Sequence, residues 1–531
     1  MIYSVLVLSL VSFVMFAYIV TYYLQLHRYE VVEMIKLNGV RLVKIISVLL
    51  AINIISCVVY NVIQSNILGV CIQICLVVTT IIFAIIIIKS NTRKNKLKFT
   101  KRVIRQLLIT TCLFVGLIYI NYIISNSIFI YFPIILVAVL VGIGIGKILE
   151  NCIANYYIKL TKVKLKRYPN LVKIGITGSY GKTSTKHILQ HILSQEHVSI
   201  CTPASYNTPM GICKFILSSD LDNMEYLIVE MGAVRRGDIL KLCDIVRPDI
   251  GIITSIGMQH LDTFGSLDNI VKTKFELYDY IINNKGVVIL NYSNANIKKY
   301  LSNYINTTNI YGINIYEIDN KYIDNDNNIV KTLDNIKIIK TDKNGIKLQY
   351  YDITTNKVVY LSTRLLGRSA CINIALSVKC AMLIGVEMQS IKMAVASLDY
   401  YNNRMELRRA SGGASVIFDA YNSNYNSYCE MLNTVRNFDA EYKILVTPGL
   451  IELGCRQHEI NRDIASKSYD VFNEVWVINK VNRDAFSEAI VSNNCIVKYF
   501  DNLTKDMLHN IDGLDDNNLV VIENDLPDIY K

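Results

Sequence analysis

The chain has 531 residues, of which 52% are hydrophobic, and its formal net charge is +11. This length exceeds one compact domain, and the hydrophobic content is high for a water-soluble enzyme. The positive charge belongs to residues 1–170, which hold 18 Lys and Arg against 3 Asp and Glu, and no basic stripe with interleaved aromatic residues marks the remainder. The composition therefore argues against nucleic acid as a partner.

Five apolar segments near residues 2–24, 42–60, 67–88, 106–125 and 127–147 are long enough to be membrane-spanning helices. The loops after the first and third segments carry Lys and Arg, whereas those after the second and fourth carry none. The positive-inside rule then places the N-terminus outside and everything after residue 148 in the cytoplasm. We therefore predict a multi-pass α-helical membrane domain over residues 1–150, followed by a Lys-rich run at 159–167 that either faces anionic lipid or is a solvated linker.

From residue 171 onward, short apolar runs alternate with helical patterns, as in parallel α/β sheets. The first part has predicted strands at 171–176, 227–230 and 250–255, a helix through about residue 193, and strand alternation at 346–351 and 357–361. A second α/β series has predicted strands near 415–419, 442–447, 474–478, 496–500 and 518–522. We expect a central P-loop ATPase domain over residues 151–402 and a Rossmann-like C-terminal domain over residues 403–531.

A glycine-rich turn, Thr177-Gly-Ser-Tyr-Gly-Lys-Thr183, follows the first of these strands. Glycines let backbone N–H groups close around phosphate oxygens at a helix N-terminus. Lys182 would then reach the outer phosphates, and the Thr183 hydroxyl would bind Mg²⁺. The first glycine usual in a P-loop is replaced by Ile176, so an ordinary strand–turn–helix connection is the alternative. The remaining predicted nucleotide-binding residues of the turn are Gly178, Ser179, Gly181 and Ser184.

Three more side chains suit a metal site only in combination. Glu230 ends an apolar strand, a position that suits a metal ligand but more often carries an ordinary strand-end acid. His260 and Lys274 flank a stretch that is typical of a helix. A lone His is usually structural or solvated, so this pair gains meaning from the order of all the motifs.

That order resembles the Mur ligase superfamily, most closely its D-alanyl-D-alanine-adding ligases. The resemblance covers about residues 170–460, and a segment beginning at Thr447 is similar to a membrane-linked subgroup. The motifs that carry it are the turn at 177–183, Tyr206-Asn-Thr-Pro-Met-Gly211, Glu230-Met-Gly232, His260 with Lys274, Gly367-Arg with Asn373, Arg404-Met-Glu406 and Asp419-Ala-Tyr-Asn-Ser-Asn424.

The resemblance implies an ATP-dependent carboxylate–amine ligase that acts through an acyl phosphate in cell-wall peptide synthesis at the cytoplasmic face of the membrane. The family uses two Mg²⁺ ions; Thr183 and Glu230 would hold one, and His260 with a carbamylated Lys274 the other. The implied catalytic residues are Lys182, His260 and Lys274. Asn373 would contact adenine, and Arg404 and Asp419 would approach the nucleotide from the C-terminal domain.

The chain also departs from the family pattern. Ser369 stands where a His is common, Tyr425 where a Pro is expected, and Glu523 begins a segment that replaces a Lys-Gly-Ser ending. The family's first domain, which binds the UDP end of the substrate, is replaced by apolar segments. This suggests a cell-wall precursor that is lipid-linked or membrane-delivered, with an amino acid or dipeptide as the amine. The alternatives are a Mur-type ligase for a different polymer, a P-loop ATPase of a membrane transport or assembly system, and a non-catalytic binding descendant.

Overall fold

The computed structural model forms two compact units, Met1–Tyr157 and Ile158–Lys531, which are described separately. The description covers residues 2–27, isolated positions between 29 and 78, and the ranges 97–124, 131–204, 206–257, 261–302, 310–316, 332–399, 405–419, 425–451, 453, 456–489 and 495–523.

The first unit contains the long helices α1 (Ile2–Leu26), α4 (Lys101–Ile124) and α5 (Tyr131–Lys166). Phe13 of α1 stacks on Phe114 of α4 with ring centroids 4.0 Å apart, within an apolar core that also contains Ala138 of α5. Part of the apolar surface of each helix is therefore packed in a shared core, whereas other apolar side chains of α4 and α5, such as Leu108 and Leu140, are exposed.

Two helices in the described part of the chain are long and apolar enough to cross a membrane, at 101–124 and 133–166. They correspond to the fourth and fifth predicted spans, and the first predicted span lies in α1, whose stretch Leu10–Leu26 is apolar but shorter. The predicted spans at 42–60 and 67–88 lie outside the described residues, apart from isolated positions. The described residues thus support two long apolar helices, and the prediction of five spans is not supported.

The helix that contains the last predicted span extends well beyond the apolar segment. Helix α5 continues past residue 147 to Lys166, because the sequence offers no Gly or Pro between 147 and 166 and the first helix breaker is Pro169. The Lys-rich run at 159–167 is therefore largely helical. The division between the two units falls inside this helix, after Tyr157.

A nine-stranded sheet opens the second unit, with the strand order β2-β3-β1-β4-β5-β6-β7-β8-β9. Strands β2 to β7 are parallel, and β8 and β9 are antiparallel additions. The strands are β1 (Val172–Thr177), β2 (Ser199–Cys201), β3 (Tyr226–Glu230), β4 (Ile250–Ile253), β5 (Val287–Asn291), β6 (Ile310–Tyr316), β7 (Thr332–Asp342), β8 (Gly345–Asp352) and β9 (Lys357–Thr363).

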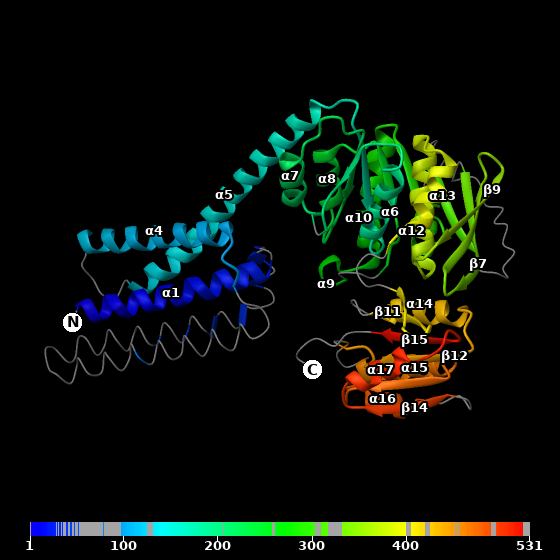
Figure 1. Ribbon diagram of the computed structural model, residues 1–531. Helices are drawn as coiled ribbons and strands as arrows, with labels where there is room; N and C mark the ends of the chain where they lie inside the picture. The colour runs from blue at the N-terminus through cyan, green and yellow to red at the C-terminus, as the bar shows by residue number, and fades with distance from the viewer. Residues whose placement is uncertain are drawn as a thin grey trace. The chain divides into compact units, whose positions relative to one another are not determined.

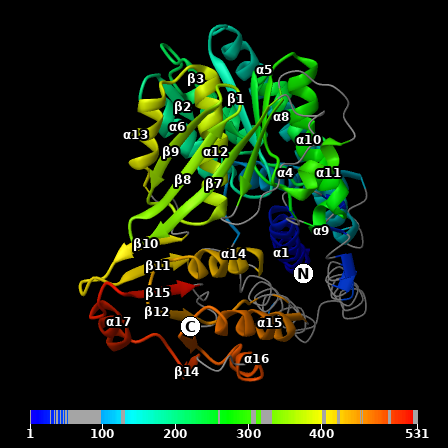
Figure 2. The ribbon, with the colours of Figure 1, turned by 90° about the vertical axis from the view of Figure 1, so that its right-hand side faces the viewer.

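Helices cover both faces of this sheet (Figures 1 and 2). The side chains of β3 alternate between the two faces of the sheet. Ile228 lies in the core that contains α6 and α12, whereas Leu227 and Val229 lie in the core that contains α7, α8 and α10. This burial on both faces explains the continuous apolar runs of the sequence. The helices are α6 (Lys182–Leu193), α7 (Pro209–Ser218), α8 (Asp238–Val246), α9 (Leu261–Phe264), α10 (Leu267–Asn283), α11 (Ala295–Leu301), α12 (Arg368–Ile384) and α13 (Met388–Ala396).

The C-terminal sheet has six strands in the order β10-β11-β15-β12-β13-β14, with only β10 antiparallel (Figure 2). The predicted strands of this part are confirmed. The elements are β10 (Glu406–Arg409), β11 (Ser415–Asp419), α14 (Tyr425–Arg436), β12 (Tyr442–Thr447), α15 (Gln457–Tyr469), β13 (Glu474–Ile478), α16 (Arg483–Ser487), β14 (Ile496–Phe500), α17 (Lys505–Asp512) and β15 (Asn518–Glu523). The expected pair of α/β sheets is therefore present.

Candidate active site

The glycine-rich turn joins β1 to the N-terminus of α6 in a conformation that depends on glycine. Gly178 has φ 152° and Gly181 has φ 84°. A Cβ on Gly178 would lie 2.1 Å from Thr254 Oγ1, so this backbone packs closely against the end of β4. Thr254 Oγ1 in turn donates a hydrogen bond to the Tyr180 carbonyl at 2.6 Å. The result is a braced loop in front of a helix N-terminus, the arrangement that binds phosphate groups.

The Lys182 ammonium lies over this loop. Its Nζ donates hydrogen bonds to the carbonyls of Gly178 at 2.8 Å and Ser179 at 3.1 Å. Burial lowers the pKa of Lys182 below its ordinary value, and the Glu230 carboxylate opposes that shift only in part. The Ser179 hydroxyl points away from the loop and donates to the Gly257 carbonyl at 3.0 Å. Ser179 thus braces the loop.

Glu230 is the centre of a buried polar cluster next to the loop. Its Oε2 accepts hydrogen bonds from Thr183 Oγ1 at 2.9 Å and from Lys186 Nζ at 3.2 Å, and its Oε1 accepts one from Asn207 Nδ2 at 3.2 Å. Burial raises the pKa of the Glu230 carboxyl, but the Lys186 ammonium and the hydrogen bonds from Thr183 and Asn207 outweigh burial, so the net pKa is lowered. Glu230 is therefore held as a carboxylate in a fixed orientation.

Thr183 and Glu230 fit one edge of a Mg²⁺ coordination shell. Adjacent oxygen ligands of an octahedral Mg²⁺ ion with bonds of about 2.1 Å lie about 3.0 Å apart, which is close to the 2.9 Å that separates the Thr183 and Glu230 oxygens. Over the part of the chain that the structure describes, no group of three or more His, Cys, Asp and Glu side chains gathers as a metal site. Any further ligands would have to come from substrate, water or other protein groups.

Lys274 lies on α10 with only 3% of its surface exposed. Burial, followed by repulsion from the Lys182 ammonium, lowers the pKa of Lys274 to about 7, although Asp238 and Glu276 act in the opposite direction. The predicted site residues His260 and Arg404 lie outside the described residues. Their relation to Lys274 and to the nucleotide remains a prediction.

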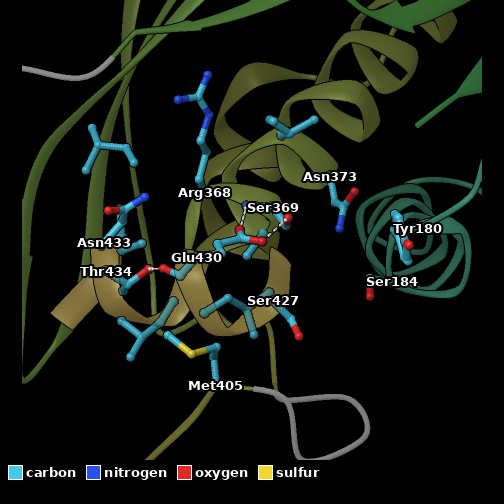
Figure 3. A pocket seen from close by; sticks show the side chains of 18 of the residues that line it. Tyr180, Ser184, Arg368, Ser369, Asn373, Met405, Ser427, Glu430, Asn433 and Thr434 are labelled. Carbon is cyan, nitrogen blue, oxygen red and sulfur yellow. Dashed lines mark hydrogen bonds between the residues drawn. The ribbon is translucent and has the colours of Figure 1, made fainter. Parts of the chain in front are cut away.

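A cavity of about 1140 Å³ opens beside the turn, between the two sheets of the second unit (Figure 3). Among the predicted nucleotide-binding residues, it brings together Gly181, Ser184, Asn373 and Asp419. Asn373 Oδ1 accepts a hydrogen bond from Thr185 Oγ1 at 3.1 Å, which ties α12 to α6. Thr183, Glu230 and Lys274 do not line this cavity, so the predicted metal ligands and nucleotide contacts form two neighbouring regions.

The cavity also contains a contact that the sequence did not reveal. Ser369, near the N-terminus of α12, donates its backbone N–H to Glu430 Oε1 at 2.5 Å and its hydroxyl to Oε2 at 2.8 Å (Figure 3). Glu430 belongs to α14 of the C-terminal sheet, and it caps a helix whose N-cap residue, Gly367, has no side chain to do so.

Lys186 and Asn207 are the other site residues that sequence reasoning missed. Asn207 stands inside a motif that was quoted for the family resemblance, so its position gave a usable signal. Lys186 lies one helical turn after Lys182, and this spacing on a helix that borders the phosphate loop was the only sign of its role.

Comparison with known proteins agrees with this geometry. Residues 176–381 match the family described as the Mur ligase middle domain. This part of the chain is therefore a Mur ligase middle domain, and the protein is an ATP-dependent amide ligase of the Mur type.

Particular relatives refine the likeness. The chain is 25% identical over 374 residues to a UDP-N-acetylmuramoyl-tripeptide–D-alanyl-D-alanine ligase of Rickettsia prowazekii, covering 70% of this chain and 79% of that one. Its counterpart from Buchnera aphidicola is 27% identical, covering 62% and 69%. The MurF ligase of Thermotoga maritima in complex with ADP has a similar fold, with a TM-score of 0.55, 22% identity and coverage of 70% and 80%.

Proposed function

We propose that this chain is a MurF-like ligase of peptidoglycan synthesis, which joins D-alanyl-D-alanine or a similar amine to a carboxylate of a muramoyl peptide. The observation that carries the proposal is the phosphate loop with the fixed Thr183–Glu230 pair on one side and a cavity large enough for a nucleotide on the other. The relatives that bear this activity in their names support the choice of substrates.

The reaction proceeds in two steps. A carboxylate oxygen of the acceptor attacks the γ-phosphorus of ATP, the bond to the β-phosphate oxygen breaks, and ADP leaves. The amine nitrogen then attacks the carbonyl carbon of the acyl phosphate, a C–N bond forms, the C–O bond to phosphate breaks, and the amine gives up a proton. Such phosphoryl transfer needs positioned charge more than covalent help from the protein.

The residues of the chain supply that charge and position. The turn that contains Gly178 and Gly181 cradles the phosphates at the α6 N-terminus, and Lys182 neutralises their outer oxygens. Ser179, whose amide donates a hydrogen bond to the Ser255 carbonyl at 2.6 Å, braces this turn. Mg²⁺ bound by Thr183 and Glu230 would polarise the phosphoryl oxygens.

The nucleotide and second-ion assignments are part of the proposal. Asn373 contacts adenine, and Arg404 and Asp419 approach the nucleotide from the C-terminal domain. His260 and a carbamylated Lys274 would hold a second Mg²⁺. Burial supports this for Lys274, because a lowered pKa leaves the amine free to add to CO₂, which gives a carbamate and releases a proton.

We further propose that the first unit anchors the enzyme in the cytoplasmic membrane as a multi-pass helical domain, with the N-terminus outside. Two domains, with their boundary near residue 402, would form the cytoplasmic part. The two long apolar helices and the Lys- and Arg-rich segments beside them support this arrangement. It would bring the active site close to a lipid-linked or membrane-delivered acceptor. Reporter fusions at the two ends should score on opposite sides, and equal scores would contradict the topology.

The function can be tested with an acceptor whose carboxylate carries ¹⁸O. Full-length protein, ATP, the labelled muramoyl peptide and a panel of amino acids and dipeptides are incubated, and both products are analysed by mass spectrometry. We expect an amide product with D-alanyl-D-alanine and transfer of one ¹⁸O atom into inorganic phosphate. Lys182→Ala is the inactive control. ATP hydrolysis without any amide product would instead favour a transport or assembly ATPase, and a different preferred amine would indicate a ligase for another polymer.

A further inference from the structure

Lys186 is a buried cation that the proposed chemistry does not use directly. It lies one turn after Lys182 on α6, and its side chain is 0% exposed. Its Nζ lies 3.2 Å from Glu230 Oε2 and 3.5 Å from the Pro203 carbonyl. A lysine is rarely buried this completely unless it is paired, so the contact with Glu230 accounts for its position.

The charges around Glu230 do not favour a free metal ion. The Glu230 carboxylate already accepts hydrogen bonds from Lys186, Thr183 and Asn207, and Lys182 is a second cation close to it. The described residues thus place one carboxylate beside two ammonium groups and offer no further cluster of acidic ligands. Such a site repels a free divalent cation and attracts a polyphosphate.

We propose that Lys186 is a positioning residue that occupies Glu230 as its counter-ion in the free enzyme, so that Mg²⁺ enters the site together with the nucleotide phosphates. This inference rests on the proposed function, because it concerns the nucleotide site of that ligase. The two lysines, one helical turn apart, have different roles. Lys182 contacts the phosphate loop, whereas Lys186 binds the Glu230 carboxylate and keeps it hydrogen-bonded to Thr183. Phosphate oxygens supply the negative charge that makes metal binding favourable.

The test measures metal binding without nucleotide. Full-length protein in detergent micelles is titrated with Mn²⁺, and free Mn²⁺ is followed by electron paramagnetic resonance. We expect weak binding to the unmodified enzyme and about tenfold tighter binding to Lys186→Met, because removal of one nearby positive charge at this range is worth at least that much. Binding of ADP in the absence of metal should weaken in the same variant. Lys186→Arg retains the charge and should resemble the unmodified enzyme in both measurements.

A double variant, Lys186→Met with Glu230→Gln, serves as the matched control. It removes both buried charges, so it avoids an unpaired carboxylate, and it should lose the gain in Mn²⁺ affinity if that gain arises at Glu230. If Lys186→Met does not fold, Lys186→Gln takes its place in the comparison with Lys186→Arg.

The possible results separate the inference from the function on which it rests. Equal Mn²⁺ affinity in Lys186→Met, Lys186→Arg and the unmodified enzyme would overturn the role proposed for Lys186. A Lys186→Met variant that is merely less stable, with unchanged metal and ADP binding, would show a structural residue only and would also overturn it. Failure of the unmodified enzyme to bind Mg²⁺ and ATP together would instead contradict the proposed function.

Discussion

Replacement of Lys274 by alanine is the most direct test of the proposed second metal site. Burial and the neighbouring Lys182 ammonium lower the pKa of Lys274 to about 7. At pH 7 about half of these amines are then neutral, against roughly 4 in 10,000 for a lysine with an ordinary pKa near 10.4. Only the neutral amine adds to CO₂, so the fold raises the reactive fraction by about three orders of magnitude.

We expect Lys274→Ala to lose a factor of about 10² to 10³ in kcat, the usual cost of removing one preorganised group that stabilises a developing charge. Acetate or formate should restore part of the rate by filling the vacated position with a carboxylate. The assay is phosphate release at saturating ATP, acceptor and amine. The unmodified enzyme, treated with the same salts, is the control. A fully active Lys274→Ala variant would refute the assignment of Lys274 to the metal site.

The same pKa predicts how stability changes with pH when CO₂ is removed. Between pH 7 and about 10, the unfolded chain carries a proton on Lys274 that the folded chain lacks, so the free energy of unfolding should rise by about 1.4 kcal/mol per pH unit from this residue. Lys274→Met should remove that increment, as measured by urea unfolding in CO₂-free buffer. An identical pH dependence in both proteins would mean that Lys274 stays protonated in the folded state.

Three further sets of substitutions test single contacts. Gly181→Ala would place a methyl group 2.6 Å from a side-chain oxygen at φ 84° and should weaken ADP binding in calorimetry, whereas Gly265→Ala, also at positive φ but in open space, should not. Glu430→Gln removes the charged cap of α12 and should raise the KM for ATP by about fivefold, or about 1 kcal/mol; an unchanged KM would contradict a coupling between this cap and the nucleotide site. Lys379→Met leaves two buried carboxylates unpaired and should cost about 3–5 kcal/mol in urea unfolding. Lys343→Met breaks an exposed pair and should cost less than about 1 kcal/mol, so equal losses would contradict the burial argument.

The sequence predicted the α/β part well because parallel strands have a strong signature. The strands at 226–230, 415–419 and 442–447 each contain a continuous apolar run of at least three residues, which is largely buried on both faces of its sheet. Adjacent parallel strands also end at the same edge of a sheet. This is why residues after β1 and at the end of β3, separated by almost fifty positions, could be expected in one site, and Thr183 and Glu230 do hydrogen-bond there.

The helical part was predicted less well because hydropathy measures apolar content and gives little information about helix ends. The last apolar segment loses its apolar character near residue 147, but the helix continues to Lys166 because polar residues without Gly or Pro sustain it. The end of the apolar segment and the end of the helix are thus different features here. Only the first can be read from hydropathy.

Contacts between distant segments explain the site residues that were missed. Lys186 reads as an ordinary helix lysine until Glu230, forty-four positions away, is placed beside it. Glu430 reads as a surface acid until α12 is placed against it. Neither pairing has a local pattern, because the geometry that creates it comes from the packing of separate elements.

Two positions at which the chain departs from the family pattern also form hydrogen bonds to side chains of other elements. Ser369, in place of a His, binds the Glu430 carboxylate of α14. Tyr425, in place of a Pro, donates a hydrogen bond to Asp463 Oδ2 at 2.8 Å. Each replacement therefore has a partner in another element, and the local packing is maintained by the pair.

Glu523, where the family has a Lys-Gly-Ser ending, leads to a different conclusion about specificity. Its side chain is buried, its Oε2 accepts a hydrogen bond from Thr447 at 2.6 Å, and it does not line the cavity. A buried acid whose hydrogen bond joins two neighbouring strands stabilises the sheet and is a poor candidate for a substrate contact. The acid that replaces the family's lysine is therefore not placed to bind a cationic amine substrate.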